Sequence, residues 1–338
     1  MHYLVTGHTG FKGAWLTLLL KQKGHTVSGI SLDPEPGSLF ETAHISDLME
    51  HDFRVDIRDS SKLSSAITEI NPEVLIHLAA QPLVRRSYRE PRETFETNVN
   101  GTLNVLEASQ NLQNLKARLI ITTDKVYKNV DRVEGYVETE PLGGDDPYSS
   151  SKAMADLLTQ SWVKSFPAMP TAIARAGNVI GGGDVCEDRL IPDAVRAFSS
   201  GKPLHIRYPN AVRPWQHVLD CVNGYLALVE ALLAGKGQGE WNFGPGTESF
   251  VSVGEVSTKA AEYWGKDAEV VVDDGENLHE ANLLALNSQR AINNLGWNNK
   301  LIYPESLNWV INWQKEVQET RDSLEATNSQ ILAFLALN

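Results

Sequence analysis

The sequence predicts an α/β protein whose parallel sheet is covered by helices on both faces. Short apolar segments alternate with helical segments through residues 2–179, and this alternation is typical of a parallel sheet. The first apolar segment leads directly into a glycine-spaced loop and then into a helix. We therefore expect a Rossmann-type, doubly wound sheet, followed by a smaller C-terminal α/β domain that binds the substrate.

The individual elements follow from local composition and spacing. Apolar, β-branched runs predict strands, which we place at residues 2–6, 25–32, 53–59, 73–80, 118–124 and 171–179. Apolar residues at helical spacing predict helices over 13–23, 62–70, 91–111 and 148–165, and later over 191–200, 218–234 and 253–264. Glycine and proline become frequent after residue 178, so we expect domains at 1–178 and 179–316, and a helical tail at 317–338.

Composition narrows the class of protein. The 338 residues carry a formal net charge of -13, which argues against a nucleic-acid partner. Two cysteines are too few for a disulfide framework or a structural zinc site, so we expect no metal. No signal peptide is visible, and every apolar run is far shorter than the roughly 20 residues of a membrane span. We expect a cytoplasmic protein with no membrane partner.

Gly7, Gly10 and Gly13 form a G-x-x-G-x-x-G loop between the first strand and the first helix. Glycines at this place permit a tight turn and let a pyrophosphate approach the backbone. The start of the helix also presents partial positive charge to the phosphates. The loop therefore predicts a dinucleotide site, although an ordinary strand-to-helix turn is the alternative.

The adenosine end of this site is less regular. The acidic residue that commonly follows the second strand and binds the ribose is replaced by Ser31, with Asp33 two residues later. This substitution weakens the preference for NAD over NADP. Asp56 ends the third strand, where its carboxylate either accepts from the adenine amino group or caps the strand end.

Tyr148 and Lys152 stand four residues apart on a predicted helix and therefore share one face. An ammonium beside a tyrosine favours phenolate and lowers the pKa of the phenol, so that Tyr148 can act as a base near neutral pH. Lys152 can also hold the nicotinamide ribose. The pair matters here because it follows the fifth strand of a chain that begins with a dinucleotide loop.

At these residues the chain resembles the extended short-chain dehydrogenase/reductase family of nucleotide-sugar enzymes, with "HLAAQ" (77–81) and "NVNGT" (98–102) at matching positions. The strand end "TTDKVY" resembles the sugar 4,6-dehydratase branch, because an acid directly follows the threonine. The Asp124–Lys125 pair is similar to the CDP-glucose 4,6-dehydratase family, as are "GHTGFKGAWL", "PLGGDDPYSSSK" and "RPWQHV".

The resemblance implies NAD as cofactor, a nucleotide diphosphate sugar as substrate, and a homodimer formed through the helices near 91–111 and 148–165. It gives catalytic roles to Thr123, Asp124, Lys125, Tyr148 and Lys152. It implies cofactor contacts at Gly7, His8, Gly10, Phe11, Lys12, Gly13, Ser31, Asp56, Ile57, Leu78, Ala79, Ala80, Asn98, Thr122, Tyr148, Lys152 and Arg175. It implies substrate contacts at Gln81, Asn178, Arg189, Arg213 and His279, where arginines and amides suit a diphosphate.

The resemblance also implies an internal redox cycle that ends with loss of water. Tyr148 takes the proton of the C4 hydroxyl, and Thr123 hydrogen-bonds the same oxygen. Lys125, or a group that it positions, removes the C5 proton, and Asp124 protonates the C6 oxygen. Asp124 then needs a raised pKa and Lys125 a lowered one. The alternatives are a dehydratase or 4-epimerase of a dTDP-, UDP- or GDP-sugar, and a non-catalytic dinucleotide-binding protein.

Overall fold

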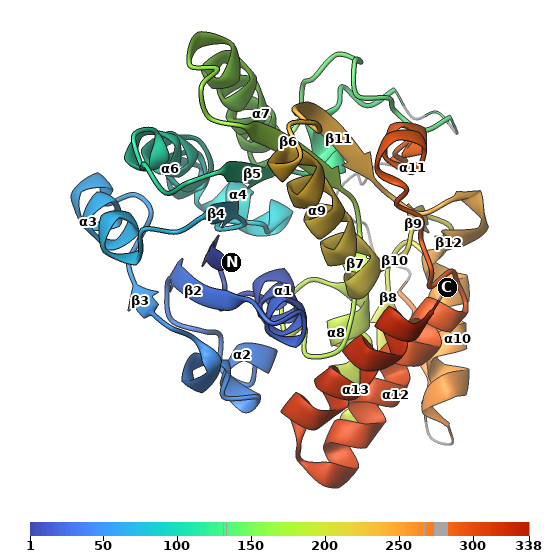
Figure 1. Cartoon of the computed structure of the whole chain (residues 1–338). Coiled ribbons are helices and arrows are strands. Elements are labelled where there is room, and N and C mark those ends of the chain that lie inside the picture. Colours follow the sequence, from blue (N-terminus) through green and yellow to red (C-terminus); the bar gives the residue numbers. More distant parts are fainter. Residues whose placement is uncertain (131, 133, 266–267, 274–282, 338) are drawn as a thin grey trace.

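A seven-stranded parallel sheet forms the centre of the computed structural model, which describes residues 1–130, 132, 134–265, 268–273 and 283–337 (Figure 1). Across the sheet the strands follow the order β11-β6-β5-β4-β1-β2-β3. Their bounds are β1 His2–Thr6, β2 Thr26–Ser31, β3 Asp52–Arg54, β4 Val74–His77, β5 Ala117–Ile121, β6 Thr171–Ala176 and β11 Gly239–Phe243. Every neighbouring pair is parallel, which confirms the predicted fold class.

The chain starts in the middle of the sheet and winds outward in both directions. It runs from β1 through β2 to β3, then returns to place β4 on the other side of β1. In sheets of this kind a crevice opens where the winding direction reverses, at the carboxyl ends of the strands. Here that point lies between β1 and β4, directly above the glycine loop.

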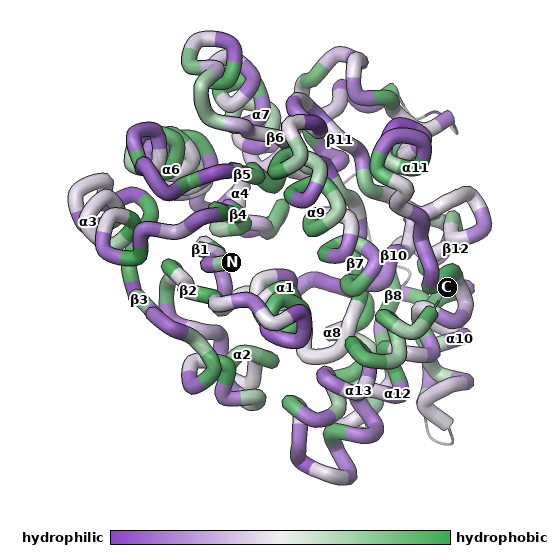
Figure 2. The backbone as a smooth tube through the Cα atoms, viewed as in Figure 1, coloured by the Kyte–Doolittle hydropathy of each residue, from purple (hydrophilic) through white to green (hydrophobic). Residues whose placement is uncertain are grey.

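Helices cover both faces of the sheet, as the figure shows for α3, α6 and α7 on one side and α1 and α9 on the other (Figure 1). The first group consists of α3 Ser60–Ile70, α4 Val84–Arg89, α5 Pro91–Phe95, α6 Gly101–Ser109 and α7 Pro147–Ser165. The second consists of α1 Phe11–Gln22, the short α2 Leu39–Thr42, α9 Val218–Leu233 and α11 Gln289–Leu295. Figure 2 shows hydrophobic colouring on the central strands and on α9, where the main core lies.

The second lobe is built around its own smaller core. It contains α8 Leu190–Ser199, α10 Val253–Trp264 and α12 Glu305–Thr320, together with the two-stranded pairs β7 Val179–Ile180 with β10 Gln216–His217, β8 Leu204–Ile206 with β13 Val270–Val272, and β9 Val212–Pro214 with β12 Phe250–Ser252. The tail forms α13 Ser323–Ala336, which packs on α1 and α12. Among the described residues, we find no helix with the length and apolarity that a membrane crossing needs.

The chain does not separate into two units at residue 178. Strand β11 lies beyond that boundary, yet it pairs with β6 and completes the first sheet. Helix α9 also lies beyond it, and its apolar side packs against β5 and β6. Residues 179–316 therefore contribute to both lobes, and the sequence missed this because the return of a chain to an earlier sheet leaves no local pattern.

The predicted helix over 91–111 is interrupted by a π-helical turn at Glu96–Asn100. Such turns occur often at functional sites because they shift one residue out of the regular ladder. Here the turn contains Asn98, whose side chain is buried. Strands β4 and β5 end earlier than predicted, so residues 78–81 and 122–123 are loop segments that border the crevice.

Candidate active site

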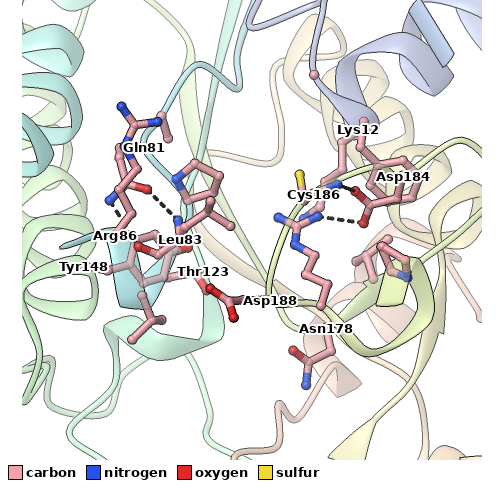
Figure 3. Close-up of a pocket in the computed structure, with 18 of the residues that line it drawn as sticks. Lys12, Gln81, Leu83, Arg86, Thr123, Tyr148, Asn178, Asp184, Cys186 and Asp188 are labelled. Atoms are coloured by element: carbon pink, nitrogen blue, oxygen red, sulfur yellow. Dashed lines mark hydrogen bonds and ion pairs between the residues drawn. The ribbon is translucent and has the colours of Figure 1, made fainter. Parts of the chain in front are cut away.

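A cavity of about 620 Å³ occupies the crevice above the sheet and extends into the second lobe. Figure 3 shows its two walls, with Gln81, Leu83, Tyr148 and Thr123 on one side and Lys12, Cys186, Asp184 and Asn178 on the other. The first wall is made by the ends of β4 and β5 and the start of α7, and the second by the glycine loop and the segment after β7.

The glycine loop has the geometry of a phosphate cradle. Gly7 has a φ of 73°, and a Cβ on it would lie 2.7 Å from the backbone nitrogen of Ala79. Gly10 precedes α1 and offers no side-chain cap, so backbone N–H groups at the start of the helix face the cavity. This cradle fits the pyrophosphate of a dinucleotide. Phe11, Lys12, Ile57, Leu78, Ala79 and Ala80 border the same cavity.

The adenosine end of the cavity carries the predicted residues Ser31 and Asp56 together with Arg58, which the sequence did not single out. Ser31 lines the cavity, and its Oγ lies 2.7 Å from Oγ1 of Thr9. Asp56 also lines it, and Arg58 donates a backbone and a side-chain hydrogen bond to its carboxylate. The hydrogen bonds from Arg58 lower the pKa of Asp56. The carboxylate of Asp56 is therefore hydrogen-bonded within its own loop. The N-cap of α3 is Asp59.

His8 and Asn98, both predicted to contact the cofactor, are not among the residues that line the cavity. His8 is buried below the loop, with Nε2 2.7 Å from Oδ1 of Asp52. Asn98 is buried and bonds the backbone of Gln81 and the hydroxyl of Ser151. Each of these side chains supports the loops of the site from behind.

Arg175 is the clearest departure from the sequence prediction. Its guanidinium is fully buried and forms two hydrogen bonds to Asp156, at 2.9 Å from Nε and 2.8 Å from Nη2. It also donates to the hydroxyl of Tyr127 at 2.7 Å. The side chain therefore holds β6, α7 and the segment after β5 together. Arg175 occupies a position of β6 whose side chain does not line the cavity. A linear motif does not show which side of the sheet a strand residue faces.

The end of β5 brings the predicted acid and its neighbours to the cavity. Thr123 caps the short turn Asp124–Val126 and donates to Oδ1 of Asp124 at 2.8 Å. Asp124 is buried, and its burial raises the pKa of the carboxyl, while the charge of Lys125 opposes that rise. The direction agrees with the requirement for a proton donor. Lys125 lines the cavity and is half-buried.

Helix α7 presents Tyr148 and Lys152 to the same space. The helix starts with Pro147, and Asp146 caps it by accepting from the N–H of Ser149 at 2.9 Å. Burial raises the pKa of Tyr148 to about 12, and a hydrogen bond with Thr123 opposes this. Burial also lowers the pKa of Lys152 to about 8.

The expected lowering of the Tyr148 pKa by Lys152 is therefore wrong. Nζ of Lys152 donates to the backbone oxygen of Ile121 at 2.8 Å, so its charge is directed at the strand end. Desolvation of the phenol outweighs the favourable interactions.

The predicted substrate residues form the far end of the cavity. Asn178, Arg189 and Arg213 line it, and Nη1 of Arg189 lies 2.8 Å from Oδ2 of the buried Asp184. Gln81 also lines the cavity, but its amide is used to bond Leu83 and Thr94. His279 lies outside the described residues.

The substrate end of the cavity also carries residues that the sequence did not single out. Asp184, Asp188 and Arg207 line the cavity, and the charged run "DVCEDR" at 184–189 was the available signal. Among the residues described by the structure, no three His, Cys, Asp or Glu side chains gather in a way that could hold a metal ion.

One cavity combines the glycine loop, the Tyr148–Lys152 pair of α7 and the acid after β5. This combination is typical of a class of nucleotide-dependent sugar enzymes. The chain belongs to the NAD dependent epimerase/dehydratase family, which it matches over residues 3–244. NAD is the cofactor of this class. The chain is 43% identical over 98% of its length to the CDP-glucose 4,6-dehydratase of Salmonella typhimurium, covering 95% of that protein.

Two further relatives are more distant. A dTDP-glucose 4,6-dehydratase of Salmonella typhimurium is 30% identical over 72% of this chain and 72% of its own length. Among solved structures, dTDP-glucose 4,6-dehydratase of Bacillus anthracis in complex with NAD superimposes with a TM-score of 0.79 at 25% identity, covering 95% of this chain and 98% of that one.

Proposed function

We propose that the protein is a CDP-D-glucose 4,6-dehydratase, which converts CDP-glucose to CDP-4-keto-6-deoxy-D-glucose and water. The observation that carries the proposal is Asp124, a buried carboxyl with a raised pKa, located beside Thr123 and in the same cavity as Tyr148. An epimerase of the same fold has no step that needs such an acid. The 43% identity to a CDP-glucose enzyme supports the choice of nucleotide.

The residues of the glycine loop and α1 fit NAD, which supplies the hydride acceptor for C4 and the hydride donor for C6. Tyr148 and Thr123 serve the C4 hydroxyl, because the two side chains are hydrogen-bonded to each other at the end of β5. A C4 oxygen beside them can donate its proton to Tyr148 only when Tyr148 is a phenolate, so binding of the substrate and cofactor has to lower the pKa that burial raises. Lys152 is placed one helical turn further on, where it can hold the nicotinamide ribose.

Elimination of water needs an acid at C6 and a base at C5. Asp124 supplies the acid, since burial keeps its carboxyl protonated to higher pH than an exposed aspartate. We assign the base to Lys125, which follows Asp124 directly and lines the same cavity. The C4 ketone acidifies the C5 proton, and Lys125 can remove that proton when it is present as the neutral amine.

The substrate is held by residues of the second wall. Asn178, Arg189 and Arg213 line the part of the cavity formed by the second lobe, where guanidinium and amide groups suit a diphosphate. The product is a precursor of deoxysugars in cell-surface polysaccharides, and we place the enzyme in the cytoplasm.

We also propose a homodimer formed through α5–α6 and α7. The support is the exposed face of α7, where Met154 and Leu157 are 47% and 52% exposed. Apolar side chains at adjacent turns of one helix are typical of a contact surface. Sedimentation of the wild type and of Leu157→Lys tests this: the charge should shift the protein toward monomers.

The function is tested by incubating the protein and NAD with CDP-glucose and detecting a 4-keto-6-deoxy product by mass spectrometry and NMR. dTDP-, UDP- and GDP-glucose serve as matched substrates. Turnover of CDP-glucose with loss of one water is the expected result. Conversion of a UDP-sugar to its C4 epimer, with no loss of water, would instead show an epimerase.

A further inference from the structure

Two ion pairs connect the opposite walls of the cavity at its solvent edge. Nη1 of Arg85 on α4 lies 2.8 Å from Oδ1 of Asp188, and Nη2 of Arg89 lies 3.2 Å from Oε1 of Glu187. The two acids belong to the segment between β7 and α8. All four side chains are partly exposed, whereas Asp188 also lines the cavity (Figure 3). We call these four residues the clasp.

Asp188 is held in an uncommon backbone conformation. Its φ is 59°, in the left-handed region that residues other than glycine seldom adopt. This conformation places the carboxylate between two arginines, with Arg85 on the catalytic wall and Nη2 of Arg207 at 4.0 Å on the second lobe. Arg207 borders the cavity as well.

On the catalytic wall, α4 is fastened to the chemistry. The N–H of Tyr148 donates to Oγ of Ser87 at 3.2 Å. The N–H of Leu83, at the start of α4, donates to Oε1 of Gln81 at 2.6 Å. Helix α4 is therefore joined to the first turn of α7 by a hydrogen bond.

On the other wall, the segment with Asp188 is fastened to the second lobe. Asp184 pairs with Arg189 at 2.8 Å, and Arg196 on α8 donates to the backbone oxygen of Val185 at 3.1 Å. The clasp thus joins the start of α7 to the start of α8, across the part of the cavity that faces Arg189.

We propose that Asp188 is a positioning residue for the sugar nucleotide, which holds the second lobe against α4 and keeps Arg207 directed into the cavity. The proposal rests on the proposed function, because a sugar nucleotide must be what the second lobe receives. A carboxylate beside a diphosphate is repelled unless cations neutralise it, and Arg85 and Arg207 do so from both sides. Closure then retains the substrate without touching the reacting carbons.

The test is a double-mutant cycle of Arg85→Ala, Asp188→Asn and the pair together. Asparagine tolerates the left-handed conformation, so Asp188→Asn removes the charge and keeps the backbone. The matched control is Lys116→Ala, which removes a 54% exposed cation that pairs with Glu73 at 2.6 Å, and neither of these two residues lines the cavity. Measured quantities are kcat and KM for CDP-glucose, and Kd for CDP and for NAD by calorimetry.

Each single variant should raise KM and the Kd of CDP by about two- to fivefold, which is the upper range for a partly exposed pair. The double variant should bind CDP no more weakly than the single variant with the larger loss, since both substitutions remove the same interaction. kcat, NAD binding and the melting temperature should stay within experimental error, as should all values of Lys116→Ala.

Three results would overturn the clasp. Singles with unchanged KM and Kd would exclude it, and so would strictly additive effects. Equal losses of NAD and CDP binding would show general damage to the fold instead. If the wild type neither binds CDP nor converts CDP-glucose, the proposed function fails first and the clasp fails with it. Wild-type activity with unaffected variants overturns the clasp alone.

Discussion

Thr122 and Thr123 are neighbours at the end of β5, yet their hydroxyls belong to two different polar regions. Thr122 donates to Asp156, which also accepts two hydrogen bonds from Arg175. Thr123 donates to Asp124, on the side of the cavity. Both aspartates are buried. The alternation of side chains along a strand separates the two regions within a single residue step.

The difference lies in the partners of the two acids. Asp156 has a bidentate arginine, so its charge is compensated where it is buried. Asp124 has a hydroxyl and a half-buried lysine next to it in the chain, and burial raises its pKa. The first arrangement stabilises the fold, and the second keeps an acid ready for the reaction. Changes on the cavity side should therefore cost activity, and changes on the other side should cost stability.

The largest effect on activity should come from Tyr148→Phe. The phenol oxygen is the proposed acceptor of the C4 proton, and phenylalanine keeps the buried ring. Turnover of CDP-glucose should fall about 100- to 10,000-fold while NAD binding and the melting temperature change little. A variant that retains more than a few per cent of the wild-type activity would assign the base elsewhere.

Asp124→Asn should stop the reaction after C4 oxidation. The amide has the same size but cannot donate a carboxyl proton, so reduced cofactor should accumulate on the protein when CDP-glucose is added, visible by its absorbance. Product formation should fall about 100-fold or more. A variant that does not reduce NAD at all would contradict the division of roles between Tyr148 and Asp124.

Lys125→Met separates the base from the acid. If Lys125 removes the C5 proton, exchange of that proton with solvent deuterium should be suppressed in the variant while NAD is still reduced. NMR of recovered CDP-glucose and product measures the exchange. Normal exchange would give the base to another group and leave Lys125 as a charge that stabilises the enolate.

The raised pKa of Asp124 predicts how the stability of the protein changes with pH. Its folded pKa is raised, so its contribution to stability is present below the unfolded value near 3.8 and is lost as pH rises through the folded pKa. Asp124→Asn should not show this loss. Denaturant unfolding of both proteins across the acidic range should give curves that diverge in favour of the variant as pH rises.

On the opposite side, Arg175→Met should destabilise the protein by about 3–5 kcal/mol, because it leaves Asp156 buried and unpaired. Asp156→Leu in addition should recover part of the loss. Lys62→Ala, which removes an exposed pair with Asp59, the cap of α3, is the control and should leave the free energy of unfolding within experimental error. If Arg175→Met and Lys62→Ala lost similar stability, the buried pair would contribute no more than a surface pair, and the contrast between the two regions would disappear.

The smallest effect should be on cofactor preference. Ser31 leaves the adenosine ribose without an acidic neighbour from β2, so the preference for NAD should be modest. Ser31→Asp should sharpen it, since a carboxylate repels a 2′-phosphate. Kd values for NAD and NADP measure the ratio, and a wild type that binds only NADP would contradict the prediction.

How far the sequence reached depended on the range of the interactions. The glycine loop and the α7 pair were predictable, because a strand, a turn and a helix fix their geometry locally. Lys125 and Asp124 came from resemblance. Arg175 was placed wrongly because its partner Asp156 meets it only after β6 and α7 have packed.

Two other features had no local signal. The clasp joins Arg85 to Asp188, more than 100 positions apart in the sequence, and each residue alone has the appearance of ordinary surface charge. The membership of β11 in the first sheet is of the same kind, since its five residues, GEWNF, give no indication of which strand they will join.

The late position of β11 has a consequence for synthesis on the ribosome. Strand β6 is complete at Ala176, but the strand that covers its open edge ends at Phe243. During the elongation of the intervening residues, β6 is an unpaired sheet edge, the kind of surface on which other chains can assemble. Helix α9, made just before β11, must also arrive before the apolar side of β5 and β6 is covered. We therefore expect slow codons between those two strands to lower the soluble yield of the protein.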